Sequence, residues 1–145
     1  MERIYFKIEI DAPKEKVWNV LLGETTYPVW TAPFAEGSRV ITDWQIGSKA
    51  LFVNAEGDGM ISKIAEHIPN EYISIHHLGM YINGVEDYES EEVKKWTGAI
   101  ENYKLSTKDG KSLLSVELDT TEDHKSYFEE KWPIALEKVK ELAEG

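Results

Sequence analysis

The sequence contains no cysteine, and this absence excludes disulfide bonds, thiolate nucleophiles and cysteine-based zinc sites. A chain without cysteine fits a reducing cytoplasm. No apolar run approaches the roughly 20 residues that a membrane-spanning helix needs. Near the N-terminus, Glu2, Arg3 and Lys7 interrupt the early apolar stretch, so no signal peptide is predicted. We therefore expect a cytoplasmic protein that does not span a membrane.

Basic residues are also scarce, with 16 lysines and arginines against 27 acids and a net charge of -11. A nucleic-acid-binding protein needs a basic face, and no basic cluster or glycine-rich phosphate loop occurs here. Nucleic acid and anionic membranes are therefore excluded as partners. Hydrophobic residues make up 41% of the 145 residues, which suffices for a core. We expect one domain over residues 1–145, because this is the usual size of a single domain.

Two periodicities predict the secondary structure. Apolar residues alternate from Ile4 to Ile10, which indicates a half-buried strand. After Pro13, the apolar positions take helical spacing up to Gly23, and an irregular aromatic stretch follows at residues 25–34. Further strands are predicted at residues 39–44, 48–54, 60–68, 72–78, 96–107 and 112–119. Their close spacing and short turns indicate one antiparallel sheet.

The C-terminal segment is predicted to be a long amphipathic helix, because apolar residues recur at steps of three and four from Phe128 to Ala143. Pro133 is expected to kink or break it. One sheet and one long helix bury their apolar faces against each other. The predicted fold class is therefore α+β, a helix-grip fold in which a curved antiparallel sheet wraps around the C-terminal helix, with short helices after the first strand. For the acidic segment 79–95 three alternatives stay open: a lid, a short helix or a long hairpin connection.

Several segments resemble a known superfamily: residues 12–18 (APKEKVW), 27–31 (YPVWT), 46–49 (IGSK), 69–74 (PNEYIS) and 127–132 (YFEEKW). Together they resemble the START-like, or birch-pollen-allergen (SRPBCC), superfamily, in the branch named after the C-terminal domain of the activator of the heat-shock-protein-90 ATPase. Residues 90–103 (SEEVKKWTGAIENY) look like a subgroup of small bacterial members. The resemblance covers essentially the whole chain and implies a helix-grip fold. It implies no single function, because the superfamily includes lipid carriers, hormone receptors, cyclases and co-chaperones.

Metal and serine chemistry find little support in the sequence. His76 and His77 are adjacent on a predicted strand and therefore point to opposite faces, so the two cannot both enter one mononuclear site. A pair of His67 with one of them remains open across the predicted hairpin. No histidine spacing matches a common ligand pattern. No G-x-S-x-G motif occurs, and Ser74 has no evident base. We predict no catalytic residue, no metal and no cofactor.

A cavity beneath the C-terminal helix is the candidate site. The predicted concave face carries Tyr103 and Leu105 on one strand and Val116 on its neighbour, and one helix covers only part of it. Glu101 or His77 is expected to be the polar end of the cavity. For Glu101 alone, the preferred interpretation is a strand end that is open to water. The predicted ligand-binding residues are Trp30, His77, Glu101, Tyr103, Leu105, Val116, Trp132 and Leu136.

Three functions remain open at this point. The leading hypothesis is non-enzymatic binding of a small hydrophobic or amphipathic molecule in the cavity, since such sites are mainly apolar with a few orienting polar groups. The alternative is a protein-interaction or stress-response module, which the resemblance to the co-chaperones implies. The third is an enzyme that uses the cavity for acid–base chemistry. The sequence indicates no particular ligand, protein partner or oligomeric state.

Overall fold

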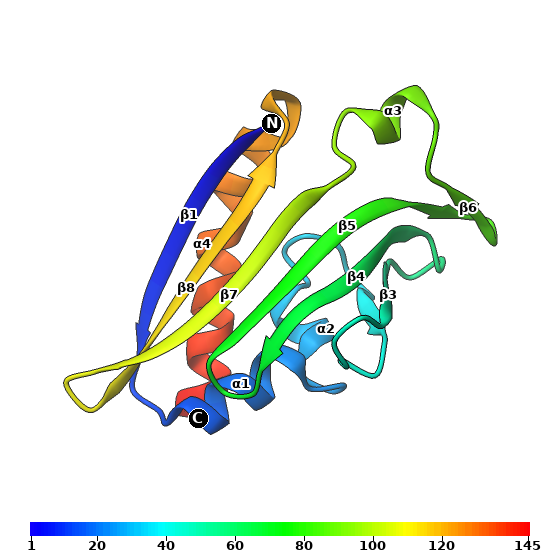
Figure 1. Ribbon diagram of the computed structural model, residues 1–145. Coiled ribbons are helices and arrows are strands. Elements are labelled where there is room, and N and C mark those ends of the chain that lie inside the picture. The colour runs from blue at the N-terminus through cyan, green and yellow to red at the C-terminus, as the bar shows by residue number, and fades with distance from the viewer.

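The computed structural model describes all 145 residues, and its central element is a curved antiparallel sheet of eight strands (Figure 1). Seven strands follow the order β1-β8-β7-β5-β4-β3-β2, and the short β6 pairs with β5. The strands are β1 (Glu2–Ile10), β2 (Arg39–Ile41), β3 (Lys49–Val53), β4 (Gly59–Ile68), β5 (Tyr72–Ile82), β6 (Val85–Asp87), β7 (Ala99–Lys108) and β8 (Lys111–Thr120).

Four helices accompany the sheet: α1 (Lys14–Leu22), α2 (Tyr27–Trp30), α3 (Glu91–Lys94) and α4 (Glu122–Glu144). The long α4 lies along β1, β8 and β7, while α1 lies beside the C-terminus and α2 lies between α1 and β3 (Figure 1). The predicted helix-grip class is therefore confirmed. None of these helices combines the length and the apolar character needed to cross a membrane.

The concave face of the sheet comes from the period-two pattern of its strands. Phe6 in β1 is the register partner of Val116 in β8, and Tyr103 in β7 is the partner of Val116 on the other side. The intervening residues point away from the core, and Tyr5 is 67% exposed. Because successive side chains of a strand alternate between the two faces, one apolar row from each strand forms the surface against which α4 packs.

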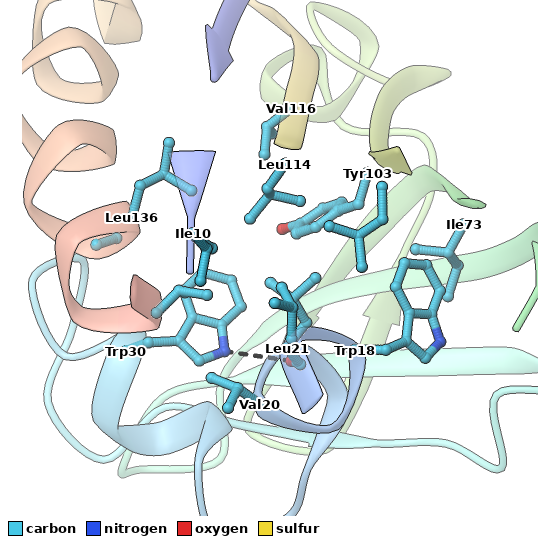
Figure 2. Close-up of a cluster of buried hydrophobic side chains, with 14 of the residues drawn as sticks. Ile10, Trp18, Val20, Leu21, Trp30, Ile73, Tyr103, Leu114, Val116 and Leu136 are labelled. Atoms are coloured by element: carbon cyan, nitrogen blue, oxygen red, sulfur yellow. Dashed lines mark hydrogen bonds between the residues drawn. The ribbon is translucent and has the colours of Figure 1, made fainter. Parts of the chain in front are cut away.

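Helices α1 and α2 close one end of the core. Val17, Trp18 and Leu21 of α1 are buried, as the helical spacing predicts. The Trp30 indole of α2 donates a hydrogen bond to the Leu21 carbonyl at 3.2 Å (Figure 2). This bond pairs the buried indole N–H with a carbonyl at the end of α1, where no intrahelical partner remains. The short helices after β1 that the fold class included are therefore present.

Pro133 does not break the C-terminal helix, so the break that was one of the two expectations is absent. The helix α4 runs through this position from Glu122 to Glu144. Proline removes one N–H, which leaves the Glu129 carbonyl without its usual partner. Both residues are on the exposed side of α4, where water can satisfy that carbonyl. The buried side carries Trp132, Leu136 and Val139 and is uninterrupted.

Two predicted segments have different bounds. The strand expected over residues 39–44 ends at Ile41, because the Thr42 and Asp43 side chains accept hydrogen bonds from backbone N–H groups two residues further along the chain. Segment 79–95 combines two of the predicted alternatives: β5 continues to Ile82 and turns into β6, and α3 follows. Asn83 and Gly84 both have positive φ (53° and 76°), the conformation of a two-residue hairpin turn.

Candidate ligand-binding site

A cavity of about 320 Å³ remains between the concave face of the sheet and the N-terminal half of α4. Side chains from α2, β3 and β4 complete its walls. Its aromatic lining consists of Tyr27, Trp30, Phe34, Phe52, Tyr103, Tyr127, Phe128 and Trp132. Ligand pockets typically enclose about 300–1,000 Å³, so the cavity fits a small molecule.

Edge-to-face contacts between the aromatic rings fix the cavity wall. The rings of Phe34 and Trp132 lie 5.0 Å apart, and those of Tyr27 and Trp30 lie 5.4 Å apart, both pairs in T-shaped geometry. Trp132 also contacts Tyr103 edge-to-face at 6.0 Å. Such pairs stabilise a defined geometry beyond the effect of their buried area. The wall is therefore a preformed apolar surface.

A second cavity, of about 260 Å³, lies beside α3 and the N-terminus of α4. Trp96 and Met80 form part of its apolar lining. The two cavities share the residues Met60, His77, Glu101, Leu118 and Phe128. Glu101 and His77 therefore stand at the junction of the two cavities and face both of them.

A chain of hydrogen bonds joins four polar side chains at this junction. Ser62 Oγ lies 2.6 Å from His77 Nδ1, and His77 Nε2 lies 2.9 Å from Glu101 Oε1. The Tyr103 hydroxyl donates to the other carboxylate oxygen, Glu101 Oε2. These residues come from β4, β5 and β7, which are neighbours in the sheet. Glu101 accepts the hydrogen bonds from both His77 and Tyr103. It is the only carboxylate of the four side chains, and its side chain is 19% exposed.

The Glu101 carboxyl is ionised at neutral pH. Burial alone would raise its pKa, but the hydrogen bond from His77, the charge of His77 and the hydrogen bond from Tyr103 together hold the pKa below its usual value. An ionised carboxylate can only accept hydrogen bonds, so His77 Nε2 is the donor in the contact with Glu101. The other ring nitrogen, His77 Nδ1, is in contact with the Ser62 hydroxyl.

Two tyrosines near Glu101 stay protonated. Burial, the charge of Glu101, the neighbouring Tyr27 and the hydrogen bond to Glu101 raise the pKa of Tyr103 well above its ordinary value. Burial and the charge of Glu101 likewise raise the pKa of Tyr27. Both phenols therefore keep their protons and add no negative charge beside Glu101.

The predicted site residues divide into two groups. Trp30, His77, Glu101, Tyr103 and Trp132 line the main cavity. The other three, Leu105, Val116 and Leu136, are buried in the hydrophobic core and do not border this cavity. Figure 2 shows Val116 and Leu136 in the tightly packed cluster around Ile10. There α4 packs directly on β1 and α1, which leaves no space between helix and sheet.

Several functional candidates were not anticipated from the sequence. Ser62 is paired with His77 only because a register irregularity between Ile61 and Ser62 shifts β4 relative to β5. Phe34 and Phe52 reach the cavity from the loop before β2 and from β3. The aromatic density of residues 25–34 was the available signal for Phe34, whereas no local pattern marks Ser62.

Two other histidines, His67 and His76, do not join this chain of hydrogen bonds. His67 Nδ1 lies 2.8 Å from the Trp44 carbonyl, and the Trp18 indole N–H donates to His67 Nε2 at 3.4 Å. Both ring nitrogens of His67 are therefore engaged. His76, on the outer face of β5, points away from His77. No group of three histidine, aspartate or glutamate side chains is arranged to hold a metal ion.

Known structures with this fold share little sequence with the chain. No protein-family model and no curated protein matches it. The Aha1 dimer from Colwellia psychrerythraea superimposes with a TM-score of 0.75 at 20% identity, over 99% of this chain and 97% of that chain. Protein MLL2253 from Mesorhizobium loti gives a TM-score of 0.74 at 14% identity, over 97% and 96% of the two chains.

A third similar structure is CalU16 from Micromonospora echinospora. Its TM-score is 0.68 at 17% identity, and the match covers 97% of this chain and 75% of CalU16. At such identities the likeness concerns the fold. It confirms the predicted fold, which this chain shares with the Aha1 dimer and CalU16.

Proposed function

We propose that this protein binds a small apolar or amphipathic molecule in the main cavity without altering it chemically. The observation that carries the proposal is the aromatic cavity of about 320 Å³ with one ionised carboxylate, Glu101, at its junction with the second cavity. Apolar walls with a few orienting polar groups are typical of ligand pockets. The fold supports the proposal only as a class, because helix-grip proteins have diverse functions.

A cavity-filling variant tests the proposal. Met60 of β4 lines both cavities, so Met60→Trp places a larger side chain where they meet. An environment-sensitive apolar dye is expected to bind the unaltered protein near stoichiometrically and to lose its binding in this variant. Lys63→Trp is the matched control, because Lys63 is an exposed residue of the same strand. Equal dye binding by all three proteins would contradict the proposal.

An interaction module is a second candidate, favoured by the likeness in fold to the Aha1 dimer. Native mass spectrometry of the freshly purified protein separates the two. A retained small molecule supports the binder. A ligand-free protein that self-associates supports the interaction module, since docking on an outer surface requires no internal cavity.

The chain of hydrogen bonds also raises the question of hydrolysis, because serine, histidine and glutamate are the components of a catalytic triad. In a triad the serine is the residue that faces the substrate, but here the carboxylate faces the cavities and the serine is buried. Ser62 is 1% exposed and no part of it lines either cavity, whereas the carboxylate of Glu101 faces both. A nucleophile must reach its substrate. The lowered pKa of Glu101 also makes it a weak base. Both features support binding rather than catalysis.

A further inference from the structure

We infer that the ligand presents a hydrogen-bond donor to Glu101, with a protonated amine on an aromatic body as the preferred form. This inference rests on the proposed function and specifies the chemical class of ligand for the same site. It follows from the direction of the hydrogen bonds, from the balance of charge around the cavities and from the nature of the walls.

Both donors that contact Glu101 point their protons toward it. His77 Nε2 donates to Glu101 Oε1, and the Tyr103 hydroxyl donates to Glu101 Oε2. Each carboxylate oxygen has accepted one hydrogen bond and retains capacity for another. Since both of these donors are used, the carboxylate offers lone pairs only at the junction of the cavities. A ligand group at this place must therefore supply the proton.

Glu101 is also the carboxylate whose charge no Lys or Arg neutralises at the junction. In the second cavity, Glu92 is paired with Lys95 at 3.5 Å and Asp119 with Arg3 at 2.9 Å. Glu101 has only His77 as an ion-pair partner, at 2.9 Å.

The main cavity contains one further charge of each sign. Arg39 and Asp58 both line it, and they offset one another in net charge. Arg39 is exposed, so its charge is well hydrated, whereas the Glu101 side chain is mostly buried. Among the buried groups of the site, the Glu101 carboxylate therefore remains without a Lys or Arg partner. An acidic ligand group at the junction would meet like charge, and a cationic group would gain an opposite one.

The aromatic walls favour the same choice. The faces of aromatic rings attract cations, and several such rings line the cavity beside Glu101, among them Tyr27, Phe52 and Phe128. An apolar body on the ligand would replace water against these rings, while its ammonium group would approach the carboxylate. A neutral alcohol satisfies the hydrogen bond but lacks the charge, so it should bind less tightly than the amine.

Three probes with the same hydrocarbon test the inference: 2-naphthylmethylamine, 2-naphthylmethanol and 2-naphthylacetic acid. Titration calorimetry at neutral pH on the full chain compares them. We expect the amine to bind about tenfold to hundredfold more tightly than the acid, the range that a charge-assisted hydrogen bond gives, with the alcohol between them. In Glu101→Gln, which keeps the shape of the side chain, the preference for the amine should fall to a few-fold while the alcohol still binds.

The outcomes separate the two proposals. If the alcohol binds in a manner that Met60→Trp abolishes, yet the acid binds as tightly as the amine, the donor inference is overturned and the binding function stands. If none of the probes binds, both are overturned. The comparison on the unaltered protein needs no variant, so it decides the matter even if Glu101→Gln fails to fold.

Discussion

The Trp132 side chain belongs both to the hydrophobic core and to the wall of the main cavity. It is 3% exposed and contacts the rings of Phe6, Trp30, Phe34 and Tyr103, with centroid distances from 5.0 to 6.0 Å. It also lines the main cavity, so part of its surface faces space that no side chain fills. We expect Trp132→Ala to destabilise the protein through the loss of these ring contacts.

The magnitude follows from these contacts. Replacing a buried aromatic residue with alanine typically costs about 3–5 kcal/mol. Because the ring already borders a cavity, fewer contacts are lost, and we expect about 3 kcal/mol, the lower end of this range. Trp132→Phe is the informative companion. It keeps one ring and removes the Nε1–H, which is buried without a hydrogen-bond partner. An unsatisfied buried donor costs about 1–3 kcal/mol, so its removal should offset most of the lost ring area.

Urea-induced unfolding, followed by far-ultraviolet circular dichroism, measures both variants against the unaltered protein. For a chain of this size, the alanine variant should also melt roughly 6–12 °C lower. The phenylalanine variant should stay within about 1 kcal/mol of the unaltered protein. A loss of less than about 1 kcal/mol in Trp132→Ala, well below the range for buried rings, would refute the packing argument. Equal losses in the two variants would refute the role assigned to the indole N–H.

Three further predictions concern the helix, the carboxylate and the histidines. A chain that ends before Phe128 should lose cooperative thermal unfolding in circular dichroism, because α4 covers the concave face; a sharp transition near the full-length midpoint would contradict this. The pKa of Glu101 lies below its ordinary value of 4.5, so its ionised form stabilises the folded state above that value, and this stability is lost as pH falls through the folded-state pKa. Below about pH 4.5, urea unfolding should therefore show the unaltered protein losing more stability than Glu101→Gln, and parallel pH profiles would argue against the network. Adding EDTA or zinc should leave the melting temperature unchanged. A rise with zinc that His67→Ala abolishes would contradict this prediction.

The elements with strong periodicity were predictable, and the weakly patterned ones were not. Alternation identified β1 and β8, and steps of three and four identified the C-terminal half of α4. The hairpin from β5 to β6 was one of three alternatives predicted for segment 79–95. The signal in favour of this hairpin is Asn83-Gly84 between apolar residues, which is a strong turn sequence. The early end of β2 depends on side chains that capture backbone N–H groups, which periodicity does not register.

Strand alternation predicted which site residues share a face of the sheet, but it did not predict where the cavity lies. Period two placed Glu101 and Tyr103 on one face of β7, and the hydrogen bond between them follows from that placement. The position of the cavity along the helix was not accessible from sequence, because it depends on where α4 approaches the sheet. The approach is close at Leu136, which is in the core, and wider at Phe128, which lines both cavities.

The energetics of Glu101 bear on why such a group is present in an apolar cavity. Removing a carboxylate from water costs free energy, and its polar partners return only part of it. Well-packed apolar residues in place of a buried ion pair are often neutral or stabilising, so stability alone does not account for the arrangement of Ser62, His77 and Tyr103 around it. These partners hold the carboxylate ionised and fix its orientation toward both cavities. A group that is held charged and kept accessible, rather than covered, is suited to an interaction that the isolated protein does not complete.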